Sequence, residues 1–307
     1  MAGAVPYGMR SWLKIFAQAA KAWNADNAFK HSAAVSFYTL FSLAPVTIIA
    51  VTVAGLFLGR DAATHQLEVQ MTQLIGPASA EAMLAAAKAS QKAPESPWAT
   101  ALGVGLVIFG ATTVFAQLQE SMNRIWGVRA KPGKSGWVLL LLHRLVSFAM
   151  VLTLAFLLLV SLVLTTVLTS MAGRLIGDNP TLLKTLDLGG SLIVITILFA
   201  LLFKVMPDVR VRWREVALGA AVTALLFTLG RYVIALYLGH STVASIYGAA
   251  GSLVALLVWV YYSCAILFFG VEFIRAYRQA HHLKVEPKET AVQVREEVVT
   301  TRPRGRD

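Results

Sequence analysis

Cysteine and charged residues are both scarce in this 307-residue sequence. The single cysteine, Cys264, excludes an intrachain disulfide and a cysteine-based metal site. Only 14% of the residues are charged, whereas soluble domains carry about 25%, so an ordinary soluble globule is excluded. A glycine-rich phosphate-binding loop with its lysine is also missing, which excludes an ATP-driven pump within this chain.

Apolar residues dominate the composition instead. Hydrophobic residues make up 57% of the chain, and the mean hydropathy is +0.66. They form long uninterrupted blocks rather than the single stripe of a soluble amphipathic helix, which indicates that lipid surrounds the fold. We therefore predict an all-α integral membrane protein.

The charge-free gaps predict six transmembrane helices, because about 20 apolar residues are needed to cross a hydrocarbon core of ~30 Å. The block from Val216 to Val271 is too long for one helix, and it divides at the polar residues that follow Gly239. The expected spans are about residues 32–58, 99–118, 138–170, 188–206, 216–238 and 249–274.

The basic residues predict the orientation of these spans. Of the 27 lysines and arginines, 21 lie on one side: before the first span, between the second and third, between the fourth and fifth, and after the sixth, with Lys204 and Arg144 counted at the ends of the fourth and third spans on that side. Positively charged loops stay in the cytoplasm, so both termini are predicted to be cytoplasmic. The same asymmetry explains the net charge of +11 without a nucleic-acid partner.

The remaining regions complete the predicted domain organisation. Residues 1–31 are expected to be a cytoplasmic interfacial amphipathic helix, and residues 32–278 the six-helix transmembrane domain. Residues 60–98 are expected to be an outer helical loop, and residues 279–307 a disordered charged cytoplasmic tail. The apolar face of the interfacial helix contains Trp12, Ile15, Phe16, Ala19 and Trp23.

Four stretches carry a family resemblance, and they occur in the family's order. They are HSAAVSFYTLFSLAP from His31, FAQLQESMNRIW from Phe115, MPDVRVRW from Met206, and YGAAGS from Tyr247 followed by Trp259, Tyr261 to Ser263 and Gly270 to Glu272. The chain thereby resembles the YihY/BrkB family of bacterial inner-membrane proteins, once labelled ribonuclease BN. The resemblance covers roughly residues 10 to 280. It implies a multi-pass protein of the bacterial inner membrane, with transport of an envelope or lipid precursor as the suspected activity.

Arg231 is the ionisable residue placed deepest in a predicted span. Ionisable residues within a bilayer are costly and are functional candidates by default. Arg231 lies in the outer half of the fifth span, where it could face a cavity that holds an anionic headgroup. The alternative is that its side chain snorkels to the outer interface.

A second group of charges is predicted at the cytoplasmic level. Glu120 ends the second span and Glu272 ends the sixth, and Arg144 begins the third. Such charges could gate an inward-facing vestibule or take part in proton coupling. The alternative is a set of structural ion pairs, Glu120 with Arg124 and Glu272 with Arg275.

Further candidates line the predicted bundle. Pro45 would bend the first span, and Tyr38 and Ser42 supply polar groups near the bend, which suits either a transport path or a packing kink. Tyr261 and Tyr262 would line a cavity or pack with a hydrogen bond in the sixth span. Close helix packing is expected at the small residues Gly248, Gly251 and Ser252.

These features favour a transporter or flippase-like carrier of an amphipathic anionic envelope compound. The alternative is a non-transporting membrane scaffold that recruits envelope-biogenesis partners through its basic cytoplasmic face. The sequence offers neither a metal-binding carboxylate cluster nor a histidine acid-base pair, so we expect no enzyme, ribonuclease included, and no metal or cofactor. Membrane lipids are the expected partners, and self-association of the chain is left open.

Overall fold

The computed structural model describes residues 9–40, 97–131, 180–240 and 251–294, with a few residues between 42 and 81. The predicted span 138–170, most of the span 32–58 and most of the outer loop lie outside the described residues.

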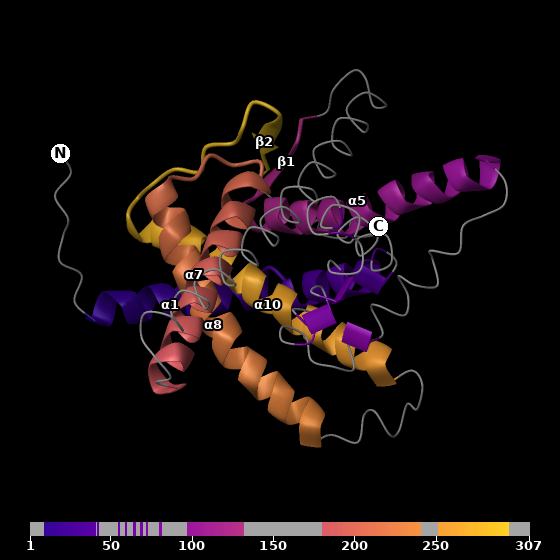
Figure 1. Ribbon diagram of the computed structural model, residues 1–307. Helices are drawn as coiled ribbons and strands as arrows, with labels where there is room; N and C mark the ends of the chain where they lie inside the picture. Colours follow the sequence, from indigo (N-terminus) through magenta and orange to yellow (C-terminus); the bar gives the residue numbers. More distant parts are fainter. Residues whose placement is uncertain are drawn as a thin grey trace, which may run out of the picture.

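The described chain is mostly helical, and its long helices coincide with predicted spans (Figure 1). Two helices are long and apolar enough to cross a membrane, over Trp213–Ile234 and Leu253–Ala280, and a shorter apolar stretch covers Gly189–Val205. The helices are α1 (Met9–Ala25), a stretch over 28–40, α5 (Pro97–Ile125), α7 (Pro180–Val205), α8 (Trp213–His240) and α10 (Gly251–Ala280). The predicted helical fold is therefore confirmed for the described residues, and two helices have the length and composition of a membrane span, whereas the number of spans stays a prediction.

α8 packs between α7 and α10, and aromatic rings join the three helices. Phe227 of α8 makes edge-to-face contacts with Phe199 of α7 and with Trp259 of α10, each with ring centroids 5.6 Å apart. Glycines allow α8 and α10 to approach closely: a Cβ atom added at Gly230 would overlap the phenol of Tyr262. That phenol donates a hydrogen bond of 3.2 Å to the backbone carbonyl of Leu226.

Large apolar side chains remain exposed along the outer sides of α7 and α8. A soluble protein rarely leaves such a continuous apolar surface uncovered, so this face suits contact with lipid. The exposed residues are Ile193 and Ile197 on α7 and Leu218, Leu225, Leu229, Tyr232, Val233 and Leu236 on α8.

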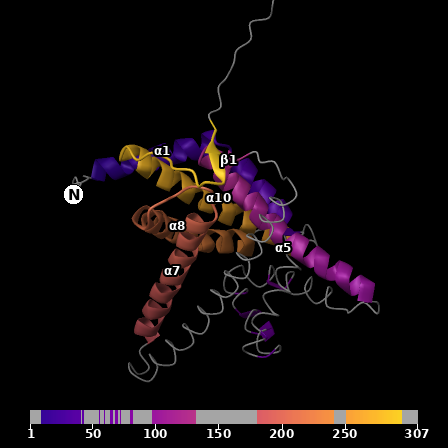
Figure 2. The ribbon, with the colours of Figure 1, turned by 90° about the horizontal axis from the view of Figure 1, so that it is seen from above.

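α1 runs antiparallel to α10 and covers its second half (Figure 2). Ile15 and Ala19 are buried against Phe273, and Trp12 stacks on the same ring with centroids 6.4 Å apart. Closer to the end of α1, Nε1 of Trp23 donates a 2.9 Å hydrogen bond to the carbonyl of Ala265. The apolar face predicted for the interfacial helix therefore exists, but α10 covers most of it.

Residues 281–294, which we call the strap, return from α10 across the ends of α5 and α7. Two residues after α10, His282 adopts a left-handed backbone (φ 54°). The amide of Leu283 then donates to the carbonyl of Arg278 at 2.9 Å, which satisfies one of the carbonyls at the end of the helix. Strand β2 (Ala291–Gln293) then pairs antiparallel with β1 (Val128–Ala130). The predicted disorder from residue 279 is therefore wrong up to Val294, because backbone pairing holds the strap and Val285 packs against the hydrophobic core.

Asn123 fixes the turn between α7 and α8. Its side-chain amide donates to Oδ2 of Asp208 and accepts from the Asp208 amide, both at 2.8 Å. Lys288 of the strap donates to the carbonyl of Val205 at the end of α7. The ends of α5, α7 and α10 are thus tied together at the side of the bundle that carries the strap.

Candidate functional site

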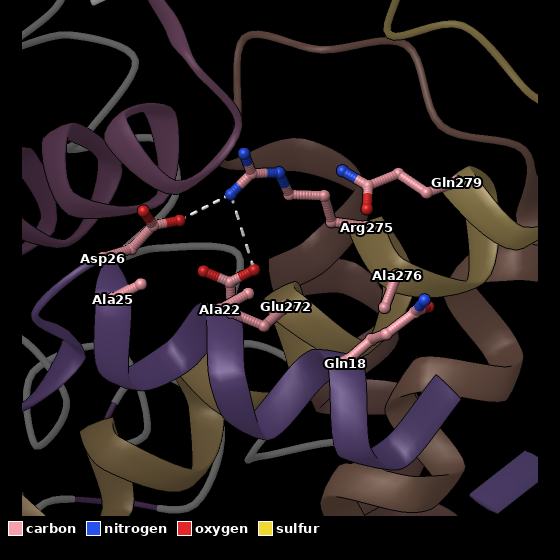
Figure 3. A pocket seen from close by; sticks show the side chains of 8 residues that line it. All are labelled: Gln18, Ala22, Ala25, Asp26, Glu272, Arg275, Ala276 and Gln279. Atoms are coloured by element: carbon pink, nitrogen blue, oxygen red, sulfur yellow. Dashed lines mark hydrogen bonds and ion pairs between the residues drawn. The ribbon is translucent and has the colours of Figure 1, made fainter. Parts of the chain in front are cut away.

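A cavity of about 230 Å³ lies between α1 and the second half of α10 (Figure 3). Three ionisable side chains, Asp26, Glu272 and Arg275, meet at it. Its other lining residues are small or amidic, namely Gln18, Ala22, Ala25, Ala276 and Gln279.

Arg275 contacts two carboxylates through the same nitrogen atom. Its Nη1 lies 2.5 Å from Oδ2 of Asp26 and 3.6 Å from Oε2 of Glu272. In Figure 3 the guanidinium reaches from α10 toward the end of α1, where Asp26 lies. Asp26 therefore holds the short contact, and Glu272 holds only the longer one.

Glu272 is fully buried and poorly satisfied. Its side chain has 0% exposure, and neither carboxylate oxygen has a hydrogen-bond partner among the described residues. A buried ionised carboxylate is costly unless it is paired and hydrogen-bonded. This group is therefore suited to take up a proton or to receive a donor that enters the cavity.

Local structure explains why the three residues converge. Glu272 and Arg275 are three residues apart on α10, so they share one face of that helix. Asp26 follows α1 immediately, and Asn27, with a left-handed backbone (φ 54°), separates α1 from the helical stretch that begins at residue 28. The hydrogen bond from Trp23 to α10 fixes this end of α1 beside the cavity.

The predicted cytoplasmic charge group is only partly brought together. The ion pair between Glu272 and Arg275 is confirmed, but Glu120 is exposed at the end of α5. Among the ion pairs between described residues, the expected pair of Glu120 with Arg124 does not occur. Arg144 lies outside the described residues.

Arg231 lies away from this cavity. Its guanidinium is 5.4 Å from the ring centroid of Tyr232, which is exposed on the outer side of α8. It is not among the residues that line the cavity. Its predicted role as an anion contact therefore remains a prediction, without support from the described geometry.

The other predicted residues take packing positions where they are described. Tyr261 stacks on Phe29 with centroids 6.4 Å apart, and Tyr38 contacts Phe37 edge to face. Ser42 is buried and donates to the carbonyl of Thr39 at 3.1 Å. Pro45 and Gly248 lie outside the described residues, as do the side-chain surroundings of Gly251 and Ser252.

Three important ionisable residues were not predicted. Asp26 and Asn27 form the short turn that follows α1. In the sequence, only the position of Asp26 next to the amphipathic helix could have suggested a role. Glu215 and Arg278 form a buried ion pair of 2.6 Å between α8 and α10. Glu215 lies in the first turn of α8, where an acidic residue is explained by the helix dipole alone. The sequence therefore gave no reason to expect Arg278 as its partner.

The comparisons with known proteins agree with this architecture. Residues 19–294 match the family described as virulence factor BrkB. The UPF0761 membrane protein of Tolumonas auensis is 32% identical over 187 residues, which are 57% of this chain and 56% of that protein. The UPF0761 membrane protein of Alcanivorax borkumensis is 26% identical over 258 residues, which are 83% of this chain and 58% of that protein.

A third relative, the UPF0761 membrane protein of Chromobacterium violaceum, is 27% identical over 247 residues, 80% of this chain and 57% of that protein. The chain spans little more than half the length of these relatives. No solved structure matches the chain. Since the family match covers nearly the whole described bundle and the strap, the chain belongs to the BrkB family of membrane proteins.

Proposed function

We propose that this protein is a multi-pass carrier in the bacterial inner membrane, with six spans and both termini in the cytoplasm. Its proposed cargo is an amphipathic anionic compound of the envelope or of lipid metabolism, moved by a transporter or flippase-like mechanism. One observation carries the proposal: Glu272 is a fully buried carboxylate beside a cavity, it shares Arg275 with Asp26, and among the described residues it has no hydrogen-bond partner.

The position of Glu272 along α10 suits a role at the membrane boundary. The apolar part of α10 begins at Leu253, and about 20 helical residues cross the hydrocarbon core. Counting from Leu253, that length ends close to Glu272. Under the proposed topology, the cavity opens near the cytoplasmic headgroups.

The charges of the cluster support coupling of an anion to a proton. With both acids ionised, the two carboxylates outweigh the single charge of Arg275, so the cluster has a net charge of −1 and repels an anionic cargo. When Glu272 binds a proton, the ion pair of Asp26 with Arg275 leaves the cluster neutral. An entering anionic group can then compete with Asp26 for the guanidinium, so proton binding favours anion binding.

Transport in proteoliposomes tests this function. The assay follows a fluorescent phosphatidylglycerol across the bilayer with purified protein at several pH values. Glu272→Gln mimics the protonated acid, so we expect its transport to lose its dependence on pH. The matched control is Glu289→Gln, which neutralises a surface carboxylate that is 92% exposed.

Arg231→Ala and Arg231→Lys test the second predicted contact in the same assay. Loss in the alanine variant with partial retention in the lysine variant would support an anion contact there. An unchanged pH profile in Glu272→Gln would refute the coupling role. No lipid movement by folded wild-type protein would refute the carrier and favour the membrane scaffold.

A further inference from the structure

A second cavity, of about 380 Å³, lies where α7 ends, α8 begins and α10 ends. The strap closes it from one side, through Leu283, Lys284 and Glu286. It shares no lining residue with the cavity at Glu272. We call it the cation pocket, because its cationic side chains are Lys204, Arg210, Arg212, Arg278 and Lys284.

Carboxylates do not neutralise this pocket. Among the described residues, the carboxylates that line it are Glu215 and Glu286, and Glu215 is already paired with Arg278 at 2.6 Å. Arg210 makes an exposed ion pair with Glu289 at 3.2 Å. Among the described residues, the other cations have no carboxylate within ion-pair distance, namely Lys204, Arg212 and Lys284.

Arg278 lines the pocket and makes three side-chain hydrogen bonds, and one of its donors has no described partner. Arg278 is buried, and its guanidinium donates to Glu215 and to the backbone carbonyls of Lys284 and Arg210. Its Nε, also buried, has no hydrogen-bond partner among the described residues. The N-terminus of α8 also faces this region, and its dipole favours an anion.

The rim of the pocket has the character of a membrane interface. Trp213, the first residue of α8, is 57% exposed, and Nζ of Lys204 lies 5.4 Å from its ring centroid. The apolar stretch of α8 begins at this same tryptophan. Tryptophan concentrates at the headgroup level of membrane proteins, and basic pockets between membrane helices bind anionic headgroups.

We propose that the cation pocket binds a phosphate-bearing anion, supplied by a lipid headgroup of the adjacent leaflet or by a free phosphate compound. Lys204, whose amine donates to the carbonyl of Val211, and Lys284 supply charges without a described carboxylate partner, and Arg278 supplies the buried donor. The proposal is independent of transport, because a bound headgroup would also stabilise a protein that carries nothing. Arg278 itself is unsuitable as a test residue, since the fold depends on its ion pair.

The test measures lipid binding to the purified full-length protein by native mass spectrometry. The pocket variant is Lys204→Gln with Lys284→Gln, and the control is Lys14→Gln with Lys21→Gln, which removes the same charge from exposed positions of α1. Since each basic contact with an anionic membrane contributes about 1 kcal/mol, the pocket variant should lose roughly tenfold to thirtyfold in affinity for phosphatidylglycerol. Binding of phosphatidylcholine should not change.

Competition by inorganic phosphate and glycerol 3-phosphate identifies the source of the phosphate. Retention of phosphatidylglycerol against both competitors indicates a lipid site, and its displacement at low competitor concentration indicates a site for a free phosphate compound. Equal losses in the pocket and control variants would overturn the proposal, because binding would then depend on overall charge. Absence of binding by any phosphate probe would overturn it as well.

Discussion

Arg275 and Arg278 lie close together near the end of α10, yet they form opposite kinds of charge cluster. Arg278 is buried, pairs with buried Glu215 at 2.6 Å and also donates to two backbone carbonyls. Arg275 is partly exposed and is shared between Asp26 and Glu272, whose carboxylate has no hydrogen-bond partner among the described residues. Both clusters border a cavity. We call the first cluster closed, because Glu215 and Arg278 satisfy each other and join α8 to α10, and the second open, because Glu272 is left without such a partner.

The difference suggests which charged residues the fold needs and which the proposed activity needs. Removing one partner of a buried, hydrogen-bonded ion pair leaves an uncompensated charge, so such a pair is essential once it has formed. A buried carboxylate that lacks hydrogen bonds contributes little to stability and is costly to keep. We therefore expect the fold to depend on Glu215 and the activity to depend on Glu272.

The largest effect is expected when the closed cluster is broken. Arg278→Met leaves Glu215 buried without its partner and should lower the free energy of unfolding by about 3–5 kcal/mol. Denaturant unfolding in detergent micelles measures this loss. The double variant Arg278→Met with Glu215→Leu should recover most of the stability, because both charges are then absent. A loss below about 1 kcal/mol in the single variant would contradict the structural role.

The close packing of α8 on α10 gives the next effect. Gly230→Ala places a methyl group on the Tyr262 phenol, so α8 and α10 must separate or the ring must move. Overpacking of this kind costs about 1–3 kcal/mol, measured by the same unfolding assay. The matched control is Gly190→Ala on α7, where the added Cβ meets no atom within 4 Å. That variant should be neutral or more stable by up to about 1 kcal/mol.

Composition predicted the helices well, because the apolar runs leave few alternatives. The predicted spans at 188–206, 216–238 and 249–274 fall within α7, α8 and α10, apart from one or two residues at the ends. The strap could not be predicted in this way. Its charged sequence suggests disorder, and it is held by backbone contacts such as the Arg210 amide to the Glu286 carbonyl at 2.8 Å, which leave no trace in composition.

The sequence predicted only one of the two ion pairs at the candidate site, because the other joins residues that are far apart in the chain. The pair of Glu272 with Arg275 follows from helix periodicity, since both residues belong to one element. Asp26 is 249 residues from Arg275 in the sequence, and only the packing of α1 on α10 brings them together. A single sequence contains no signal for such a long-range pair, so Asp26 was missed.

Neutralising the open cluster should have a small effect on stability, in contrast to the closed one. Glu272→Gln removes a carboxylate that accepts no hydrogen bond from the residues that the structure describes, and Arg275 keeps its contact with Asp26. We expect a change below about 1 kcal/mol in the free energy of unfolding, whereas Glu215→Gln should cost several-fold more. Equal losses in the two glutamine variants would remove the distinction between the clusters.

The smallest effect concerns pH and the strap. Burial lowers the pKa of Lys288, whose amine donates to the Val205 carbonyl at 3.1 Å; nearby Lys204 also lowers this pKa, while Asp208 opposes the shift. Between the lowered folded pKa and the ordinary value of 10.5, the unfolded chain binds more protons at this position than the folded chain. Stability from this residue therefore rises with pH across that window and is constant below it.

Lys288→Met removes this titration and leaves the rest of the strap intact. The free energy of unfolding of the wild type, measured relative to that of the variant, should therefore increase as the pH approaches 10.5 from below. Taking the difference cancels the titration of the other lysines and tyrosines. A difference that falls with rising pH would contradict this prediction. It would mean that the folded protein favours the charged amine, so that its attraction to Asp208 and to the Val205 carbonyl outweighs the cost of burial.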